Sequence, residues 1–191
     1  SGLDLDIIPT TFILPNDFSL FVEEYKKAPS LMWIMKPTAR SQGKGIFLFN
    51  KLGQINEWKK DHRWKADNPQ AEAYVVQRYI ENPLLVGGKK FDLRLYVLVT
   101  SYSPLTVYIY RSGFARFSLY RYNTTAKNLS DNYVHLTNAA IQKTGPGYDK
   151  EAGCKWSLRH LKLYLLGKYG VQATDQLFSS IQDICINSLL S

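Results

Sequence analysis

The chain has 191 residues, 45% of them hydrophobic and 21% charged, and this balance excludes a wholly disordered protein. Its formal net charge is +8, which attracts polyanions, although charge alone fits a solvated surface without a partner equally well. Two cysteines are too few for a disulfide framework and favour reduced thiols in an intracellular protein, and no apolar run reaches the roughly 18 residues of a membrane span.

Apolar periodicity in the first half of the chain predicts a sheet with helices. Asp17 is a candidate N-cap for an amphipathic helix, because apolar residues follow it at helical spacing: Phe18, Phe21, Val22 and Tyr25. Short apolar runs predict strands at 31–35, 46–49 and 74–80. A basic loop at 38–45 separates the first two strands, and a short helix at 55–58 and a loop at 59–69 are expected before the third.

The second half contains the most regular strand pattern. Apolar residues alternate at Phe91, Leu93, Leu95, Val97 and Val99, which predicts a single strand with one buried face. A hairpin partner at 105–110 and a strand at 114–117 are expected next, then an extended or turn element at 133–138 and a loop at 143–155. Helices are expected at 158–166, between Ser157 as N-cap and Gly167 as C-cap, and at 174–190.

Three charged residues lie in the most regular strand. The side-chain period of two places Lys90, Asp92 and Arg94 on one face. Charges are rare in an apolar strand unless they are paired or bind something, so the spacing fits either a binding site or a structural ion pair on a solvated face. Arg111 and Arg116 flank a glycine turn and could reach the face that carries Arg94.

Polar residues near strand ends are further candidates for ligand contacts. Lys36 ends the first apolar strand, where a lysine faces either a ligand or solvent. The loop Gly43-Lys44-Gly45 could offer N–H groups and a cation to phosphates, but it lacks the Walker A pattern and fits an ordinary hairpin loop as well.

Two more segments have a functional and an ordinary interpretation. Gln77-Arg78-Tyr79-Ile80 ends a strand beside an expected lobe boundary at 81–83, where backbone groups could pair with a base edge or simply link two strands. Thr137 and Asn138 could contact hydroxyl groups of a ligand or cap a turn.

Histidine chemistry has little support in the sequence. Metal-ligand spacing is absent among His62, His135 and His160, so each is interpreted as a structural residue rather than a ligand. The sequence also lacks a nucleophile elbow and a recognisable catalytic triad.

Six short motifs occur in order along the chain. They are Trp33-Ile34-Met35-Lys36-Pro37, Gly43-Lys44-Gly45-Ile46, Gln77-Arg78-Tyr79-Ile80, Gly88-Lys89-Lys90-Phe91-Asp92-Leu93-Arg94, Tyr110-Arg111-Ser112-Gly113-Phe114-Ala115-Arg116 and His135-Leu136-Thr137-Asn138. This set resembles the tubulin tyrosine ligase-like family over roughly residues 7–190, and residues 39–45 and 113–117 resemble its glutamylating branch. The resemblance implies an α+β chain with an incomplete ATP-grasp fold, in which antiparallel sheets with flanking helices form two lobes, at 1–82 and 83–191.

The resemblance also implies ATP-dependent ligation of an amino acid to a carboxylate. ATP would phosphorylate a glutamate side chain, and an amine, expected to be that of free glutamate, would attack the acyl phosphate. By analogy, the ATP-binding residues are Lys36, Gly43, Lys44, Gly45, Gln77, Arg78, Tyr79, Ile80, Lys90, Asp92, Thr137 and Asn138. The residues expected at the γ-phosphate and acyl-phosphate end, in a catalytic role, are Arg94 and Arg116.

Magnesium is expected with ATP, but its ligands are not evident in this chain. The family carries an acid and a Glu-x-Asn pair on a later strand, whereas the oxygen ligands after Lys155 are Asp175, Asp183 and Asn187. The last two fall on a predicted helix at the wrong spacing. We therefore expect the metal ligands to lie beyond Ser191. Because the chain also starts without Met, we expect it to be a segment of a longer ligase and to be inactive alone.

The expected partners are the acidic tubulin tail, whose charge complements the basic chain, free glutamate and accessory subunits. The expected location is the cytoplasm and cytoskeleton, at a cilium, basal body or flagellar axoneme, with no membrane association. Two other classes stay open. One is a non-catalytic tubulin- or microtubule-binding module or pseudoenzyme; the other, nucleic-acid binding, rests on charge and on Tyr96, Tyr108 and Tyr110 as stacking platforms.

Overall fold

The computed structural model describes residues 7–61, 72–125 and 128–191. Two compact units emerge, each discontinuous in sequence. The N-terminal unit comprises residues 8–90 and 118–148, and the C-terminal unit comprises residues 91–117 and 149–191 with Ile7. Along the sequence, the chain passes from the first unit to the second after Lys90, within a strand, and returns to the first unit at Ser118, whereas the predicted lobe boundary is at 81–83. The lobes of an ATP-grasp fold stay a prediction.

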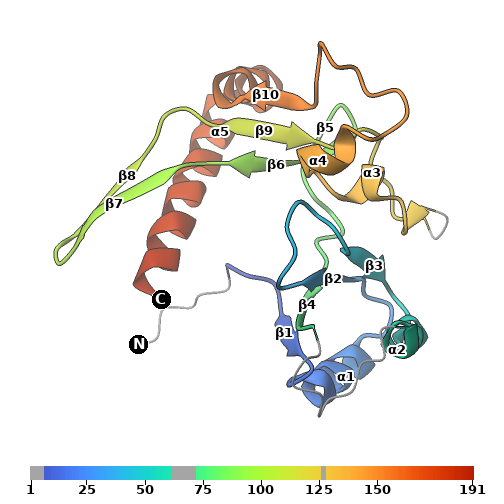
Figure 1. Ribbon diagram of the computed structural model, residues 1–191. Coiled ribbons are helices and arrows are strands. Elements are labelled where there is room, and N and C mark those ends of the chain that lie inside the picture. Colours follow the sequence, from blue (N-terminus) through green and yellow to red (C-terminus); the bar gives the residue numbers. More distant parts are fainter. Residues whose placement is uncertain (1–6, 62–71, 126–127) are drawn as a thin grey trace. The chain divides into compact units, whose positions relative to one another are not determined.

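An antiparallel sheet of four strands forms the N-terminal unit (Figure 1). Its spatial order is β1 (Thr11–Leu14), β4 (Tyr74–Arg78), β2 (Trp33–Pro37) and β3 (Phe47–Phe49). The predicted strands are confirmed with bounds shifted by one or two residues, whereas β1 was missed because Pro9 and Pro15 flank it as turn signals. In the register of β2 and β4, Met35 lies opposite Val76 and Ile34 opposite Gln77, which fixes the two faces of the sheet.

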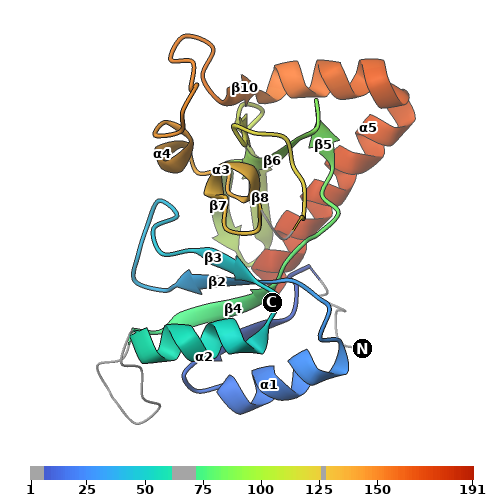
Figure 2. The same cartoon turned by 90° about the vertical axis from the view of Figure 1, so that its right-hand side faces the viewer.

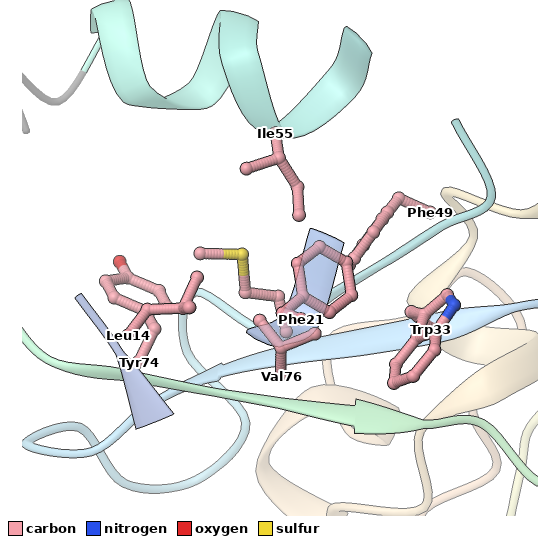
Figure 3. Close-up of a cluster of buried hydrophobic side chains, with 8 residues drawn as sticks. Leu14, Phe21, Trp33, Phe49, Ile55, Tyr74 and Val76 are labelled. Atoms are coloured by element: carbon pink, nitrogen blue, oxygen red, sulfur yellow. The ribbon is translucent and has the colours of Figure 1, made fainter. Parts of the chain in front are cut away.

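One face of this sheet carries the main core, beneath α1 (Phe18–Lys27) and α2 (Leu52–Asp61) (Figures 1 and 2). The buried side chains of the cluster are Met35 and the seven that Figure 3 labels: Leu14, Phe21, Trp33, Phe49, Ile55, Tyr74 and Val76. Phe21 is fully buried and packs edge-on against Trp33, with ring centroids 5.1 Å apart. The helical spacing predicted after Asp17 is thus confirmed, although the Asp17 side chain makes no capping bond to α1 and accepts instead from the Ile13 N–H.

The second face of the sheet packs against residues 129–141 in a smaller cluster that includes Ile34, Leu48, Tyr79 and Leu136. The extended or turn element predicted at 133–138 is confirmed in part: a single helical turn, α3 (Asn132–His135), covers its first half, and Leu136 and Asn138 after it are extended. The Asp131 carboxylate accepts from the Tyr133 N–H at 2.8 Å, and this cap starts a helix in a segment with poor helix propensity. A second turn, α4 (Ala139–Gln142), follows.

The C-terminal unit contains an antiparallel sheet in which β9 (Phe114–Phe117) lies between β6 (Lys89–Arg94) and β10 (Lys155–Ser157). The first two residues of β6, Lys89 and Lys90, belong to the N-terminal unit and pair there with β5 (Leu85–Val86). Ala115 and Phe117 point to the buried face of this sheet, and the Phe117 ring contacts Trp156 at 5.0 Å between centroids. β5 and β10 are each too short to give a periodic signal and were not predicted.

The single strand predicted at 91–99 is wrong. β6 ends at Arg94, and β7 (Val97–Tyr102) then pairs with β8 (Leu105–Ile109) as a separate hairpin, which confirms the predicted partner at 105–110. The predicted buried face is also absent among these residues: Val97 is 39% exposed and the other alternating positions are only partly buried. A two-stranded ribbon has no second layer, so alternation there does not mean burial.

A bent helix, α5 (Leu158–Leu190), ends the chain (Figure 2). Ser157 is its N-cap, as predicted, and accepts from the His160 N–H at 3.1 Å. The break lies at Gly170 rather than at the predicted Gly167, because Gly170 adopts φ 82°, a conformation open to glycine. No described helix has both the length and the apolar character that a membrane crossing requires. The predicted α+β class with antiparallel sheets is confirmed.

Candidate functional site

Lys36 and Gln77 form a polar pair on the second face of the N-terminal sheet. The Lys36 Nζ donates to Gln77 Oε1 at 2.7 Å, and Gln77 Nε2 donates to Thr11 Oγ1 at 2.9 Å. Partial burial lowers the pKa of Lys36. Because Gln77 is a neutral amide, this bond orients the ammonium without cancelling its charge, which suits a cation that meets phosphate oxygens.

A second lysine of the unit belongs to a chain of hydrogen bonds. Lys90 Nζ donates to the Tyr79 hydroxyl oxygen and to the His135 carbonyl oxygen, both at 2.9 Å. The Tyr79 hydroxyl lies 3.1 Å from His135 Nδ1, and His135 Nε2 lies 2.9 Å from the Asn128 carbonyl oxygen. The ammonium also lies 4.5 Å from the centre of the Tyr79 ring.

The directions of these bonds follow from their partners. A carbonyl only accepts, so His135 carries its proton on Nε2 and leaves Nδ1 as an acceptor for the Tyr79 O–H. Burial lowers the pKa of His135 and raises the pKa of Tyr79, so a neutral imidazole and a neutral phenol are favoured at neutral pH. The interpretation of His135 as a structural residue agrees with its burial and with protein partners at both ring nitrogens, although the sequence did not reveal what those partners are.

The basic loop between β2 and β3 is a hairpin connection, as its ordinary interpretation allowed. Two turns close it, with the Lys44 N–H donating to Ser41 and the Ile46 N–H to Gly43, both at 3.3 Å. Gly43 has φ +84° and is buried against Asn138 and Ile141, so the structure brings two predicted site segments together. The Lys44 side chain is exposed.

Replacing Gly43 by alanine is expected to destabilise this contact. A Cβ there would lie 2.5 Å from Ile141 Cδ1 and 3.1 Å from Asn138 Oδ1, in a backbone conformation that L-residues disfavour. We expect a loss of about 1–3 kcal/mol of unfolding free energy, measured by denaturant titration. Gly53→Ala is the control, since nothing lies within 4 Å of the added atom. An equal loss in both variants would contradict the close approach.

The remaining predicted residues of this unit differ in their exposure. Arg78 and Ile80 are exposed, and the N–H groups of Arg78 and Tyr79 already donate to the carbonyls of Thr10 and Met32. Thr137 is buried at 8% exposure. Asn138 occupies the N-cap position of α4, but its side chain makes no capping bond. The Asn138 side-chain amide therefore does not have the turn-capping role that the sequence allowed.

Asp92 and Arg116 form a bidentate ion pair across β6 and β9 in the C-terminal unit. They lie directly opposite in the register, and Arg116 Nε donates to Asp92 Oδ1 at 2.7 Å while Nη2 donates to Oδ2. The hydrogen bonds that Arg116 donates to Asp92 raise the pKa of Arg116. The structural ion pair that the spacing allowed is thus present. Arg94 is exposed two residues further on, whereas Arg111 lines a separate pocket of ≈ 830 Å³ beside α5.

Magnesium has no evident site in the described part of the chain. Over residues 7–61, 72–125 and 128–191, no three His, Cys, Asp or Glu side chains gather closely enough to hold a metal ion. The described residues therefore do not fit a magnesium centre. His62, which was interpreted as structural, lies outside the described residues.

The buried imidazole predicts how stability depends on pH. The pKa of His135 is lowered in the folded state, so below about 6.5 the unfolded chain binds a proton that the folded chain resists. The unfolding free energy should fall on acidification by at most about 1.4 kcal/mol per pH unit over this window. Denaturant titrations between neutral and mildly acidic pH measure the slope, and His135→Asn should flatten it. An unchanged slope in that variant would contradict the assignment.

Comparison with known proteins agrees with this combination of motifs and fold. The chain matches the model of the tubulin-tyrosine ligase family over residues 1–191. It is 48% identical over 214 residues to a probable tubulin polyglutamylase TTLL9 of Bos taurus, covering 97% of this chain and 46% of that protein. It is 51% identical over 194 residues to a probable alpha-tubulin polyglutamylase Ttll1 of Tetrahymena thermophila, covering 99% of this chain and 46% of that protein.

A more distant relative shows the same match. The chain is 39% identical over 192 residues to the tubulin polyglutamylase TTLL5 of Homo sapiens, covering 97% of this chain and 14% of that protein. The chain thus spans about half the length of the relatives from Bos taurus and Tetrahymena thermophila. The predicted resemblance is confirmed, and the chain belongs to the tubulin-tyrosine ligase family.

Proposed function

We propose that the protein containing this chain is an ATP-dependent ligase that adds glutamate to side-chain carboxylates of the acidic tubulin tail. Family membership supports this proposal, as do relatives whose names describe tubulin polyglutamylases. The chain covers 46% of two of these relatives, so the activity is proposed for the whole protein and not for the 191 residues alone.

The observation that carries the proposal is a pair of oriented lysines at the second face of the N-terminal sheet, where Lys36 donates to Gln77 and Lys90 of β6 donates to Tyr79. Each of these two bonds is donated to a neutral oxygen, and a bond of that kind orients an ammonium without cancelling its charge. We propose that the unit is the central lobe of an ATP-grasp fold and that ATP binds on this face. Lys36 would contact phosphate oxygens, and the residues from Gln77 to Ile80 would contact the adenine.

The loop at 43–45 would cover the phosphates. Gly43 is anchored beside Asn138, which supports a ligand role for that loop together with the segment of Thr137 and Asn138. We propose that Thr137 and Asn138 contact the ribose and that Lys44, whose side chain is exposed, supplies a further cation to the phosphates.

In the C-terminal unit, we propose catalytic roles for Arg94 and Arg116 toward the γ-phosphate and the acyl phosphate. Fixed cations stabilise the charge that develops during phosphoryl transfer. Asp92 holds the Arg116 guanidinium in one orientation through two hydrogen bonds. Its carboxylate oxygens retain lone pairs, so the proposed ribose contact of Asp92 is compatible with the ion pair.

The chemistry proposed for these residues is a sequence of binding and charge stabilisation. The cations neutralise the phosphates, so that the γ-phosphoryl group can move to the glutamate carboxylate with release of ADP. The amine of free glutamate then attacks the acyl carbon, and phosphate leaves as the isopeptide bond forms. The described residues do not fit a magnesium centre, so none of these steps is assigned to the metal.

The proposed partners and location follow from this substrate. The acidic tubulin tail suits the net charge of +8, because opposite charge accelerates encounter. We propose a cytoskeletal location in the cytoplasm, at cilia, basal bodies or flagellar axonemes, and accessory subunits as additional partners.

The full-length protein incubated with tubulin, ATP and isotope-labelled glutamate tests the proposal. Mass spectrometry of the tubulin tails should find labelled glutamate only when ATP is present. A preparation that binds tubulin without ATP-dependent incorporation would overturn the ligase assignment in favour of a non-catalytic binding module. Glycine in place of glutamate, in a parallel reaction, tests which amino acid is transferred.

A further inference from the structure

We propose that His135 is a positioning residue for the Lys90 ammonium, acting both directly and through Tyr79. The inference rests on the proposed function, because its consequence is that ATP meets a lysine whose place is fixed before the nucleotide arrives. His135 itself was not among the predicted ligand-binding residues, and its side chain contacts protein groups at both ring nitrogens.

Two acceptors supplied or controlled by His135 hold the ammonium. Its carbonyl oxygen accepts one Lys90 proton at 2.9 Å. Its Nδ1 accepts a hydrogen bond from the Tyr79 hydroxyl. The lone pairs of the Tyr79 oxygen are then available to accept a hydrogen bond from Lys90 Nζ, also at 2.9 Å. A lysine side chain is flexible, and two fixed acceptors remove much of the entropy that binding a ligand would otherwise cost.

The far end of the network fixes the tautomer. The Asn128 carbonyl accepts from Nε2, so the proton cannot move to Nδ1 without losing that bond. The ring is 1% exposed, and the rings of Tyr79 and Tyr122 contact it edge-on, with centroids 5.8 and 5.7 Å away. The imidazole therefore has one orientation. Through their hydrogen bonds, this fixed ring also sets the positions of the Tyr79 hydroxyl and the Lys90 ammonium.

Protonation of Nδ1 would disturb the arrangement. An imidazolium donates at both nitrogens, so Tyr79 would have to accept from His135 as well as from Lys90, and two cations would approach each other. The charged and titratable groups near the ring are Lys90 and Asp131, with Tyr79 and Tyr122 packed against it and Glu81 beside the two tyrosines. The affinity for ATP should consequently fall as His135 becomes protonated.

Conservative variants separate positioning from simple packing. His135→Asn places an amide oxygen near the position of Nδ1 and keeps an acceptor for Tyr79. His135→Phe keeps a planar ring and removes both hydrogen bonds of the ring. Tyr79→Phe removes the oxygen that lies between Lys90 and His135 while its ring stays. A role limited to packing predicts that Phe is the better replacement for His135; the positioning role predicts that Asn is.

The experiment measures the affinity of a non-hydrolysable ATP analogue by calorimetry, and KM for ATP and kcat, on the full-length protein. His135→Phe and Tyr79→Phe should each weaken analogue binding and raise KM about tenfold, the effect of one charge-assisted hydrogen bond, while kcat changes less. His135→Asn should stay within about threefold of the wild type. The weakening of wild-type binding on acidification should be reduced in His135→Asn.

The outcomes are distinguishable. If the wild type binds the analogue but Tyr79→Phe and His135→Phe bind equally well, positioning is overturned while the proposed function stands. If His135→Phe fails to fold, Tyr79→Phe still decides, because its ring fills the same space. If the wild type does not bind the analogue, the proposed function and this inference are both overturned.

Discussion

Lys36→Met should reduce kcat/KM for ATP-dependent glutamylation by about 10²–10³-fold with little effect on folding. The lysine is half-buried at the end of β2, and its Nζ donates to Gln77 Oε1 at 2.7 Å. The position of its ammonium is therefore fixed and partly shielded from water. Methionine has a similar length and fills the same apolar path, but it offers no positive charge to phosphate oxygens. The measurement is the steady-state rate of glutamate transfer by the full-length protein.

Lys26→Met is the matched control for this prediction. Lys26 is exposed on α1, which packs on the opposite face of the same sheet, so the variant removes the same charge away from the proposed ligand. We expect its rate within about twofold of the wild type, since a distant surface charge is screened by salt. Equal loss in both variants would mean that the rate follows total charge, and the role of Lys36 would then be wrong.

Phe21→Ala should produce the largest loss of stability, about 3–5 kcal/mol of unfolding free energy. The ring is fully buried where α1 meets the sheet, and it contacts five other aromatic rings: Phe12, Phe18, Tyr25, Trp33 and Phe49. Truncation removes the apolar contacts of the ring and leaves a cavity that the rigid strands cannot fill. Denaturant titration of wild type and variant measures the difference.

Leu20→Ala controls for the effect of the substitution on the helix itself. Leu20 precedes Phe21 on α1 but is 57% exposed, so its removal should change the unfolding free energy by less than about 1 kcal/mol. Similar losses in the two variants would contradict the position of Phe21 at the centre of the core (Figure 3).

Much of the N-terminal unit was predictable because local and tertiary signals agree there. The apolar spacing after Asp17 predicted α1, and the runs around Trp33 and Val76 predicted strands of one sheet. The spacing of Lys90, Asp92 and Arg94 correctly predicted a shared face, because the register of β6 with β9 keeps the period of two. These features depend on neighbours in sequence or on a regular strand.

The errors have a common physical cause: the secondary structure of these segments depends on the strand or side chain that they meet in the fold. Alternation from Phe91 to Val99 could not reveal that the chain leaves one sheet at Arg94 and enters a two-stranded hairpin at Val97. The turn at α3 depends on the Asp131 cap, and the short β10 exists only because β9 lies beside it.

The site was predictable in part. The motifs identified Lys36, Gln77, Tyr79 and Lys90 as candidates, yet no sequence signal showed that their polar atoms meet in two hydrogen-bonded groups. The role proposed for His135 depends on a tautomer that the Asn128 carbonyl fixes, and this contact exists only in the folded chain. Likewise, spacing alone left Asp92 open between a ligand contact and the ion pair with Arg116 that the structure contains.

Photoaffinity labelling of the full-length protein tests most directly whether ATP binds at the second face of the N-terminal sheet, beside Lys36 and Lys90. An azido-adenine analogue of ATP would be cross-linked, and the labelled peptides identified by mass spectrometry, with unlabelled ATP as competitor. We expect labelling that ATP competes in the peptides that contain Gln77 to Ile80 or Lys90. Labelling that ATP competes but that falls wholly on other peptides would contradict it.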